Sequence, residues 1–169
     1  MSYLALVGSA FAITTGLASA KAISNITNAD PGVVTATAHG YNNTDEVLLV
    51  TDWEDFNYSI FRVTNKTTDT FELAGYDTSN TTFYPAGSDT GNAYKISGWQ
   101  SLGQILGITP SGGDARYEEL SPFDKRNGVR IAVGFNPSSF EMELGFDDSR
   151  TDQSLLLAAS RAQEKLGFR

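Results

Sequence analysis

Residues 29–50 read ADPGVVTATAHGYNNTDEVLLV and contain two β-rich runs joined by a turn. In VVTATA (33–38), apolar and polar residues alternate, as in a strand with one buried face. EVLLV (46–50) is a short apolar run, and HGYNNTD between the two is rich in turn residues. The only histidine, His39, lies in this turn, and the chain has no cysteine that could join it in a metal site. We therefore interpret His39 as a turn residue and not as a catalyst.

The rest of the chain continues this pattern of short strands. Strands are predicted at residues 60–64, 70–75, 93–99, 129–135 and 139–146, and the first two form a hairpin around the turn NKTTD. Leu155, Ala159, Ala162 and Leu166 then recur at helical spacing, which predicts one helix with a stop at Gly167. Residues 102–128 are the longest stretch without periodicity. The pattern indicates a β framework with a single helix.

The net charge of −8 is carried by one part of the chain. Residues 30–91 hold ten acidic residues against two basic ones, whereas the acids and bases of the remainder balance. Binding to the phosphate backbone requires lysine and arginine. Such a protein can therefore lie next to nucleic acid without binding it. The absence of cysteine also excludes disulfides and thiolate chemistry.

The first twenty residues, MSYLALVGSAFAITTGLASA, are similar to a secretory signal. They lack its basic start, however, and glycine, serine and threonine interrupt the apolar run. We interpret residues 1–20 as an arm that packs on, or inserts into, a neighbouring molecule. Residues 21–169 are then expected to form a single domain, because the chain has the length of one domain with a core.

Residues 51–59, TDWEDFNYS, are predicted to be an acidic, aromatic loop. Its carboxylates could bind Ca²⁺, but their spacing does not match a known calcium loop, so a solvated or partner-facing loop is preferred. Trp53, Phe56 and Tyr58 could stack on a carbohydrate. We favour a contact with another protein, for which exposed aromatic side chains are equally suited.

Glu141 and Glu143 alternate with apolar residues in the predicted strand 139–146 and so share one face of it. Two carboxylates at this spacing would suit a glycosidase, but alternating glutamates are also the ordinary pattern of an exposed strand face. No phosphate-binding loop, nucleophile motif or zinc motif is found. We therefore predict no enzyme, no catalytic residue, no cofactor and no metal site.

Three segments resemble the tail tube proteins of long-tailed bacteriophages. They are ISNITNADPGVVTATAHGYNNTDEVLLV (23–50), FRVTNKTTDTFELAGYDTS (61–79) and YPAGSDTGNAYKISGW (84–99). The second half agrees more loosely, through ILGITPSGGDARYEELSPFD and FEMELGFDDSRTDQSLLLAAS. The resemblance implies a mainly β fold, a β-sandwich or partial barrel, with one flanking α-helix and long loops between subunits. Family members usually carry more sequence after the helix, so the resemblance leaves three alternatives for this chain: it is truncated, processed or unusually short.

The resemblance also implies a function. Six copies would form a ring, and rings made in the host cytoplasm would stack into the hollow tail tube of the virion, through which DNA passes without specific binding. The expected partners are the protein itself and other tail proteins, with no membrane insertion. We expect Glu141 and Glu143 to face the lumen, where negative charge repels DNA. Within the loop 110–128, we expect the contact between rings at Phe123, Asp124, Lys125 and Arg126.

An alternative is a tail-associated binding or decoration module. It would contact a host-surface glycan or another tail protein through the aromatic loop 51–59. This alternative predicts a monomer or trimer with glycan affinity, whereas the tube protein predicts self-assembly.

Overall fold

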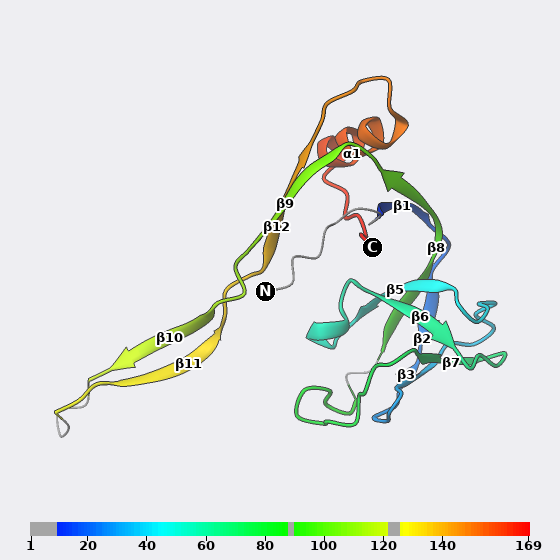
Figure 1. The fold of residues 1–169 in the computed structure, drawn as a ribbon. Helices are drawn as coiled ribbons and strands as arrows, with labels where there is room; N and C mark the ends of the chain where they lie inside the picture. The colour runs from blue at the N-terminus through cyan, green and yellow to red at the C-terminus, as the bar shows by residue number, and fades with distance from the viewer. Residues whose placement is uncertain (1–9, 88–89, 122–125) are drawn as a thin grey trace, which may run out of the picture. The chain divides into compact units, whose positions relative to one another are not determined.

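The chain folds mainly into β-strands, and the described residues contain one α-helix, α1 (Thr151–Ala162). The computed structural model describes residues 10–87, 90–121 and 126–169 (Figure 1). Contacts divide the chain into two units: unit 1 runs up to Ser101 and takes in Ala159–Arg169, and unit 2 is Leu102–Ala158. The predicted mainly β fold with a single helix is confirmed.

The strands that begin in unit 1 form one open sheet of eight strands. They are β1 (Phe11–Leu17), β2 (Lys21–Ile23), β3 (Asn25–Ile26), β4 (Val33–Thr35), β5 (Glu46–Thr51), β6 (Ser59–Thr64), β7 (Thr70–Leu73) and β8 (Gly91–Leu102). Their order is β1, β8, β5, β6, β7, β4, β3. Since β2 and β5 pair with the same residues of β8, they lie along its opposite edges.

Alternation along the central strands builds the core of unit 1. In β5, Val47 and Leu49 are fully buried, whereas the residues between them are partly exposed. β6 and β7 form the predicted hairpin, in which Val63 pairs with Leu73 and both side chains are fully buried. Burying one side chain of this size contributes about 1.5–3 kcal/mol. These three strands therefore supply much of the stability of unit 1.

His39 is a structural residue of the turn between β4 and β5, as predicted. Its buried ring packs against Tyr41 and Phe71. The backbone N–H of Tyr41 donates to His39 Nδ1 at 2.9 Å, and Nε2 lies 3.2 Å from the carbonyl oxygen of Thr70. Because Nδ1 accepts, the proton sits on Nε2, which donates to Thr70. The fold thus uses both ring nitrogens.

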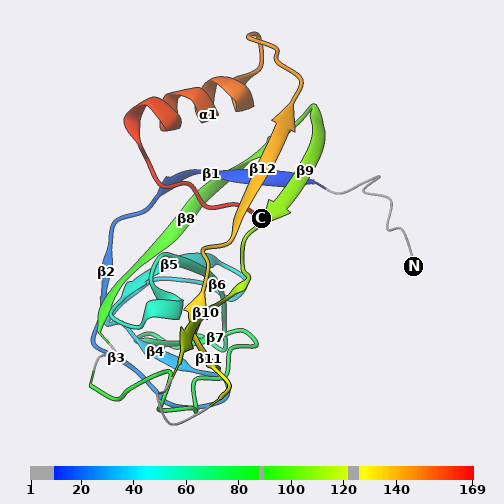
Figure 2. The ribbon, with the colours of Figure 1, turned by 90° about the vertical axis from the view of Figure 1, so that its left-hand side faces the viewer.

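Unit 2 contains a long two-stranded antiparallel ribbon. It is made of β9 (Ile105–Ser111), β10 (Ala115–Leu120), β11 (Val129–Phe135) and β12 (Ser139–Leu144), and we call these four strands the ribbon. β9 pairs with β12 and β10 with β11, and Figures 1 and 2 both show the second pair continuing the first. The prediction of a long loop at residues 110–128 is therefore wrong over residues 115–120, which form β10. Strands that are exposed on most of both faces, as β9 and β10 are, lack an alternating apolar pattern.

The helix is also shorter than predicted: α1 ends at Ala162 and not beside Gly167. Residues 167–169 instead pair with the edge strand β1, where the backbone groups of Ala12 and Arg169 exchange hydrogen bonds of 2.9 and 3.1 Å. A side chain at position 167 would lie 2.4 Å from Ile60 Cδ1, which explains the glycine there. This pairing covers backbone groups that an edge strand otherwise leaves free.

The predicted arm divides between described and undescribed residues. Residues 11–17 form β1 and pair with β8 of the same chain. Residues 1–9 lie outside the described residues. The assignment of residues 1–20 to an arm and of 21–169 to a single domain stays a prediction.

Candidate assembly surface

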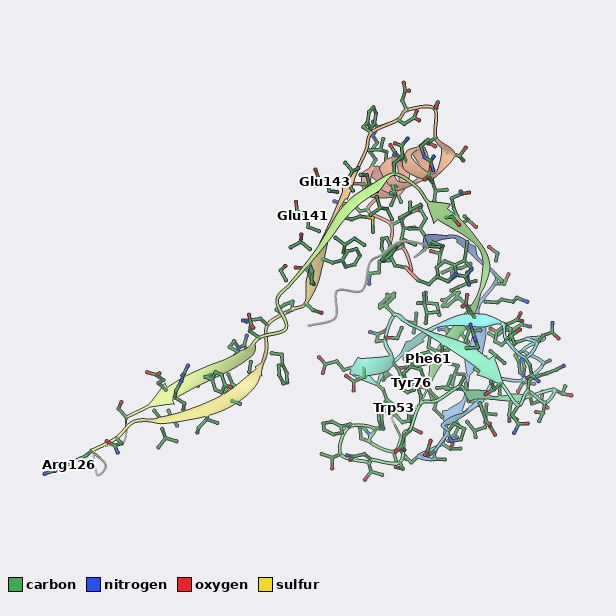
Figure 3. All side chains as sticks on the ribbon, in the orientation of Figure 1. Trp53, Phe61, Tyr76, Arg126, Glu141 and Glu143 are labelled. Carbon is green, nitrogen blue, oxygen red and sulfur yellow. The ribbon has the colours of Figure 1, made fainter. Side chains whose placement is uncertain are left out.

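Glu141 and Glu143 lie on β12 with exposed side chains. They pair with Thr109 and Gly107 of β9, and Met142 between them is partly buried on the other face. Figure 3 shows the two glutamates following one another along the ribbon. The common face inferred from the sequence is present, and its role as a lumen wall stays a prediction.

The predicted contact loop between rings falls mostly outside the described residues: Phe123, Asp124 and Lys125 belong to the part that is left out. Arg126 is described and exposed, and it lies in the connection between β10 and β11 at the far end of the ribbon (Figure 3). Asn127 and Gly128 follow it. The ladder closes with the pair Leu120–Val129, and neither Asn127 nor Gly128 has a positive φ, so this Asn-Gly pair is not a two-residue hairpin turn and could not have located β10 and β11 in the sequence.

The aromatic residues predicted to contact a partner are mostly core residues, which corrects that expectation. Trp53 and Phe56 are each 1% exposed. The short 3₁₀ helix η1 (Glu54–Phe56) turns the chain so that both rings enter the core. Trp53 Nε1 donates to the carbonyl oxygen of Pro85 at 3.0 Å, so its polar atom is also satisfied inside the fold. Of the three, only Tyr58 is exposed, at 49%.

These buried rings belong to an aromatic cluster of unit 1. Phe56 packs against Phe61 with ring centroids 4.6 Å apart, and Phe61 against Tyr76 at the same distance. Figure 3 labels Trp53, Phe61 and Tyr76 of this cluster. Edge-to-face and tilted ring pairs of this kind stabilise a core beyond the area that they bury. The rings therefore have a sufficient structural reason to be in the loop.

The β10–β11 hairpin, by contrast, exposes apolar side chains. Every residue of β11 is exposed, and in β10 only Ala115 is partly covered. Val133 is 41% exposed and Phe135 76%. A two-stranded hairpin is at best marginally stable in water. A partner that covers these apolar side chains would therefore stabilise it.

One face of this hairpin is apolar. Leu120 pairs with Val129, and Glu118 pairs with Ile131, so these four side chains share a face. Three of the four are large and apolar, and all are exposed. We call the side chains of Leu120, Val129 and Ile131 the apolar face.

The opposite face satisfies its own polar groups. Arg130 Nε lies 3.3 Å from Glu119 Oε1, and its guanidinium stacks over the ring of Tyr117 with 4.8 Å to the centroid. Such internal pairing leaves this face less in need of a partner than the apolar face.

Unit 2 has little core of its own. Among its described residues only Leu102, Asp152 and Gln153 are buried, and two of these are polar. In unit 1, a continuous cluster of buried apolar side chains lies along the sheet. The exposed ribbon is thus not supported by a core in the way that the sheet is.

The corner between β12 and α1 is nevertheless firmly held. Asp152 Oδ2 accepts the backbone N–H of Gly103 at 2.8 Å and Arg150 Nη2 at 2.9 Å, and Oδ1 accepts Arg150 Nε at 3.0 Å. Arg150 and the Gly103 amide together lower the pKa of Asp152 to about 2. The buried carboxylate is therefore ionised and joins the start of α1 to the end of β8.

The same corner carries an apolar pocket. It is lined by Leu144, Phe146, Gln153, Leu156 and Leu157. Both polar atoms of the Gln153 amide bond to the corner's backbone, since Oε1 accepts the N–H of residue 147 at 2.8 Å and Nε2 donates to the carbonyl of residue 145 at 2.6 Å. Apart from Gln153, all the residues that line the pocket are apolar.

The wall of this pocket is exposed to solvent. Phe146 is 76% exposed and Leu157 46%. Asp147 and Asp148 follow Phe146, and hydrogen bonds from Ser149 hold the pKa of Asp147 below its usual value. The pocket thus leaves apolar surface uncovered, and two aspartates follow its residue Phe146 in the sequence.

Other kinds of site find no support in the part of the chain that the structure describes. No three histidine, cysteine, aspartate or glutamate side chains gather there as a metal centre would require. No described helix is long and apolar enough to cross a membrane. The surface features of the chain are those of an assembling protein.

Comparison with known proteins also indicates a protein that assembles. The family model described as phage tail tube protein, TTP, matches residues 51–168, which include the hairpin of β6 and β7, the whole ribbon and α1. None of the curated proteins matches the chain. Because the family model covers well over half of the sequence, the chain belongs to the phage tail tube proteins and is a structural component of the virion.

Proposed function

We propose that copies of this chain close into rings, six to a ring, and that the rings stack into a hollow tube through which phage DNA passes. The observation that carries this proposal is the exposed ribbon of unit 2, with its apolar face and without a core beneath it. A monomer would keep this surface in water. A closed ring covers this surface on every copy, and a stack covers it on every copy but the last.

The acidic composition supports a conduit for DNA. Glu141 and Glu143 are exposed on one face of β12. A wall that repeats these carboxylates from copy to copy repels the phosphates, so the polyanion slides and does not bind.

The contact between rings is proposed for the connection of β10 and β11, at Phe123, Asp124, Lys125 and Arg126. Arg126, the described member, is exposed at the far end of the ribbon, where it can reach another molecule. The arm of residues 1–20 is proposed as a second packing element. Its described part contributes β1 to the sheet of the same chain.

Electron microscopy of the purified protein over a concentration series tests the assembly. Hollow tubes or rings of uniform width are expected, and six-fold symmetry in end-on class averages would support the ring of six. Small monodisperse particles at every concentration would overturn the proposal. Rings with another symmetry would correct the copy number alone.

A single introduced thiol tests the lumen assignment, because the chain has no cysteine. In tubes of Glu143→Cys, a small maleimide is expected to react, whereas a maleimide coupled to a protein too large for the bore is not. The unassembled variant, as control, should react with both reagents. Equal reaction of both reagents with the tubes would place Glu143 outside the lumen.

The alternative of a glycan-binding or decoration module depended mainly on the aromatic loop, and the structure removes this support. Its contact depended on three exposed rings, and Trp53 and Phe56 are buried in the core of unit 1. Tyr58 alone, covered on one side by Lys165 Nζ at 3.3 Å from its ring centroid, makes no stacking platform. We therefore propose the tube function alone.

A further inference from the structure

We infer that Asn127 is a site of spontaneous covalent modification, at which the side-chain amide is lost and both aspartate and isoaspartate form. The site is the dipeptide Asn127-Gly128, which leads into β11, and both of its residues are exposed. The reaction requires only water and takes place within a single copy of the chain. The inference therefore does not depend on the function proposed above.

The reaction begins when the backbone nitrogen of Gly128 attacks Cγ of Asn127. A bond forms between these two atoms, the bond from Cγ to Nδ2 breaks, and Nδ2 leaves as ammonia with the proton of the attacking nitrogen. The product is a cyclic imide. Water then opens the ring at one of its two carbonyl carbons. Opening at Cγ gives aspartate, and opening at the backbone carbonyl carbon gives isoaspartate.

Gly128 permits the close approach that this attack requires. It has no side chain that would hinder the contact between its nitrogen and Cγ of Asn127. No other asparagine of the chain is followed by glycine. Neither residue has a positive φ, and the strand ladder begins only after them, with the pair Leu120–Val129. The dipeptide is therefore fixed neither by a tight turn nor by strand pairing.

The reacting groups are also free of hydrogen bonds. Within the part of the chain that the structure describes, neither the side chain of Asn127 nor the backbone N–H of Gly128 has a hydrogen-bond partner. Arg126 and Val129 on either side are exposed as well, and Figure 3 shows Arg126 at the end of the ribbon. Exposed backbone at the end of a two-stranded hairpin opens readily, so the chain can reach the geometry of the ring.

Two other exposed asparagines lack this combination. Asn80 precedes a β-branched threonine, and its Oδ1 accepts the backbone N–H of Thr82 at 3.0 Å, which engages the amide in a turn of its own. Asn136 precedes Pro137, whose nitrogen has no proton to lose. Exposure alone therefore does not make an asparagine of this chain reactive.

The two products change the start of β11 in different ways. Aspartate places a negative charge directly after Arg126. Isoaspartate carries the same charge and also lengthens the backbone, because the chain then runs through Cγ. Only Gly128 separates this change from Val129, the first residue of β11. The modification thus alters both the charge and the chain length at the end of the ribbon.

Incubation of the dilute, unassembled protein at neutral and at mildly alkaline pH tests the site. The chymotryptic peptides 124–135 and 77–83 each contain one asparagine and no glutamine, Asn127 in the first and Asn80 in the second. Mass spectrometry is expected to show conversion of Asn127 at least about ten-fold faster than that of Asn80, with both aspartate and isoaspartate as products. The rate should rise with pH, because the attacking nitrogen must lose its proton.

Gly128→Ala is the matched control. The nearest described atom outside the adjoining residues, the carbonyl oxygen of Leu120, would lie 3.5 Å from the added methyl group, so the ribbon can accept it. The methyl group hinders the attack, and conversion of Asn127 should become at least about ten-fold slower. Equal rates in the two proteins, or aspartate without isoaspartate, would overturn the inference.

Comparison with the unfolded protein tests whether the folded ribbon leaves the site free. In guanidinium chloride, Asn127 should be converted at a rate within about three-fold of that in the folded protein, because little structure has to open first. Asn80, which loses its hydrogen bond on unfolding, should be converted faster than in the folded protein. A folded-state rate for Asn127 more than about ten-fold below the unfolded rate would show that the ribbon protects it and would overturn the inference.

Discussion

The carboxylate of Asp152 joins two segments that are far apart in sequence. It accepts hydrogen bonds from Arg150 and from the backbone of Gly103, and its side chain is almost completely buried. An ionised group in such a place is stable only while these donors surround it. The corner that carries the pocket therefore depends on one charge.

Asp152→Asn is expected to lower the free energy of unfolding by about 1.5–3 kcal/mol at neutral pH, the usual contribution of hydrogen bonds to a charged group. Since the pKa of Asp152 is about 2 in the folded protein and lower than in the unfolded chain, the stabilisation is complete above about pH 4 and disappears as the pH falls toward 2. Urea unfolding at several pH values, followed by circular dichroism, measures the difference between the two proteins.

The matched control for this substitution is Asp114→Asn, an exposed aspartate of the same unit, which should leave the stability nearly unchanged. A deficit of Asp152→Asn that is the same at pH 3 and at pH 7 would show that the charge is not responsible.

At the scale of elements, the decisive feature is the junction at which the β9–β12 pair passes into the β10–β11 pair. Gly112 and Gly113 lie there with φ of +79° and +77°. A side chain at position 112 would meet the carbonyl oxygen of Pro137 at 2.0 Å, whereas none would be hindered at position 113. The two glycines thus share a backbone conformation and differ in the space around them.

Gly112→Ala is therefore expected to disturb the ribbon and to raise the concentration required for assembly by at least ten-fold. In Gly113→Ala, the only cost is the strain of a left-handed residue, about 1–2 kcal/mol. This variant should therefore assemble at a lower concentration than Gly112→Ala. Sedimentation of tubes over a concentration series measures both variants. Equal behaviour of the two would argue that the close approach to Pro137 does not matter.

Tryptophan fluorescence is the control for the fold of unit 1 in these variants. Both tryptophans of the chain, Trp53 and Trp99, belong to unit 1. Their emission should be the same in Gly112→Ala, Gly113→Ala and the unsubstituted protein, because the substitutions lie in unit 2.

At the scale of the whole molecule, the apolar core and the assembly surface are carried by different units. Unit 1 holds the continuous core, while unit 2 has the exposed ribbon and few buried residues. As a member of the tail tube family, the chain assembles with copies of itself and with other tail proteins. We expect the core of unit 1 to keep a single subunit folded and the neighbouring copies to stabilise its ribbon.

Hydrogen exchange should reflect this division. In dilute, unassembled protein, the amides of β11 are expected to exchange much faster than those of β5, because β11 is exposed throughout and β5 lies in the core. On assembly, protection should rise strongly in β10 and β11 and change little in β5. Protection of β11 that is already equal to that of β5 in the dilute protein would mean that the ribbon needs no partner.

The predictions from sequence succeed where the signal is local. The strand at 46–50, the hairpin of 60–64 with 70–75 and the existence of one helix follow from the spacing of apolar residues within each segment, and the structure confirms them. His39 likewise has its role in the turn that surrounds it. These features need only the period of a strand or a helix and the chemistry of a turn.

The sequence predicts loops at residues 51–59 and 110–128, and in both segments only the tertiary structure shows which residues are buried or paired. Trp53 and Phe56 are buried because strands remote in sequence provide the rings that surround them. β9 and β10 exist because β12 and β11 pair with them, although neither carries an alternating pattern.

For the assembly surface too, some features follow from the sequence and others only from the tertiary structure. The sequence by itself determined the charge, the strand periods and the common face of Glu141 and Glu143. Only the tertiary structure decided that the apolar face is left uncovered and that a pocket lies beside α1. The physical reason is that periodicity is a property of one segment, whereas burial depends on every segment that packs against it.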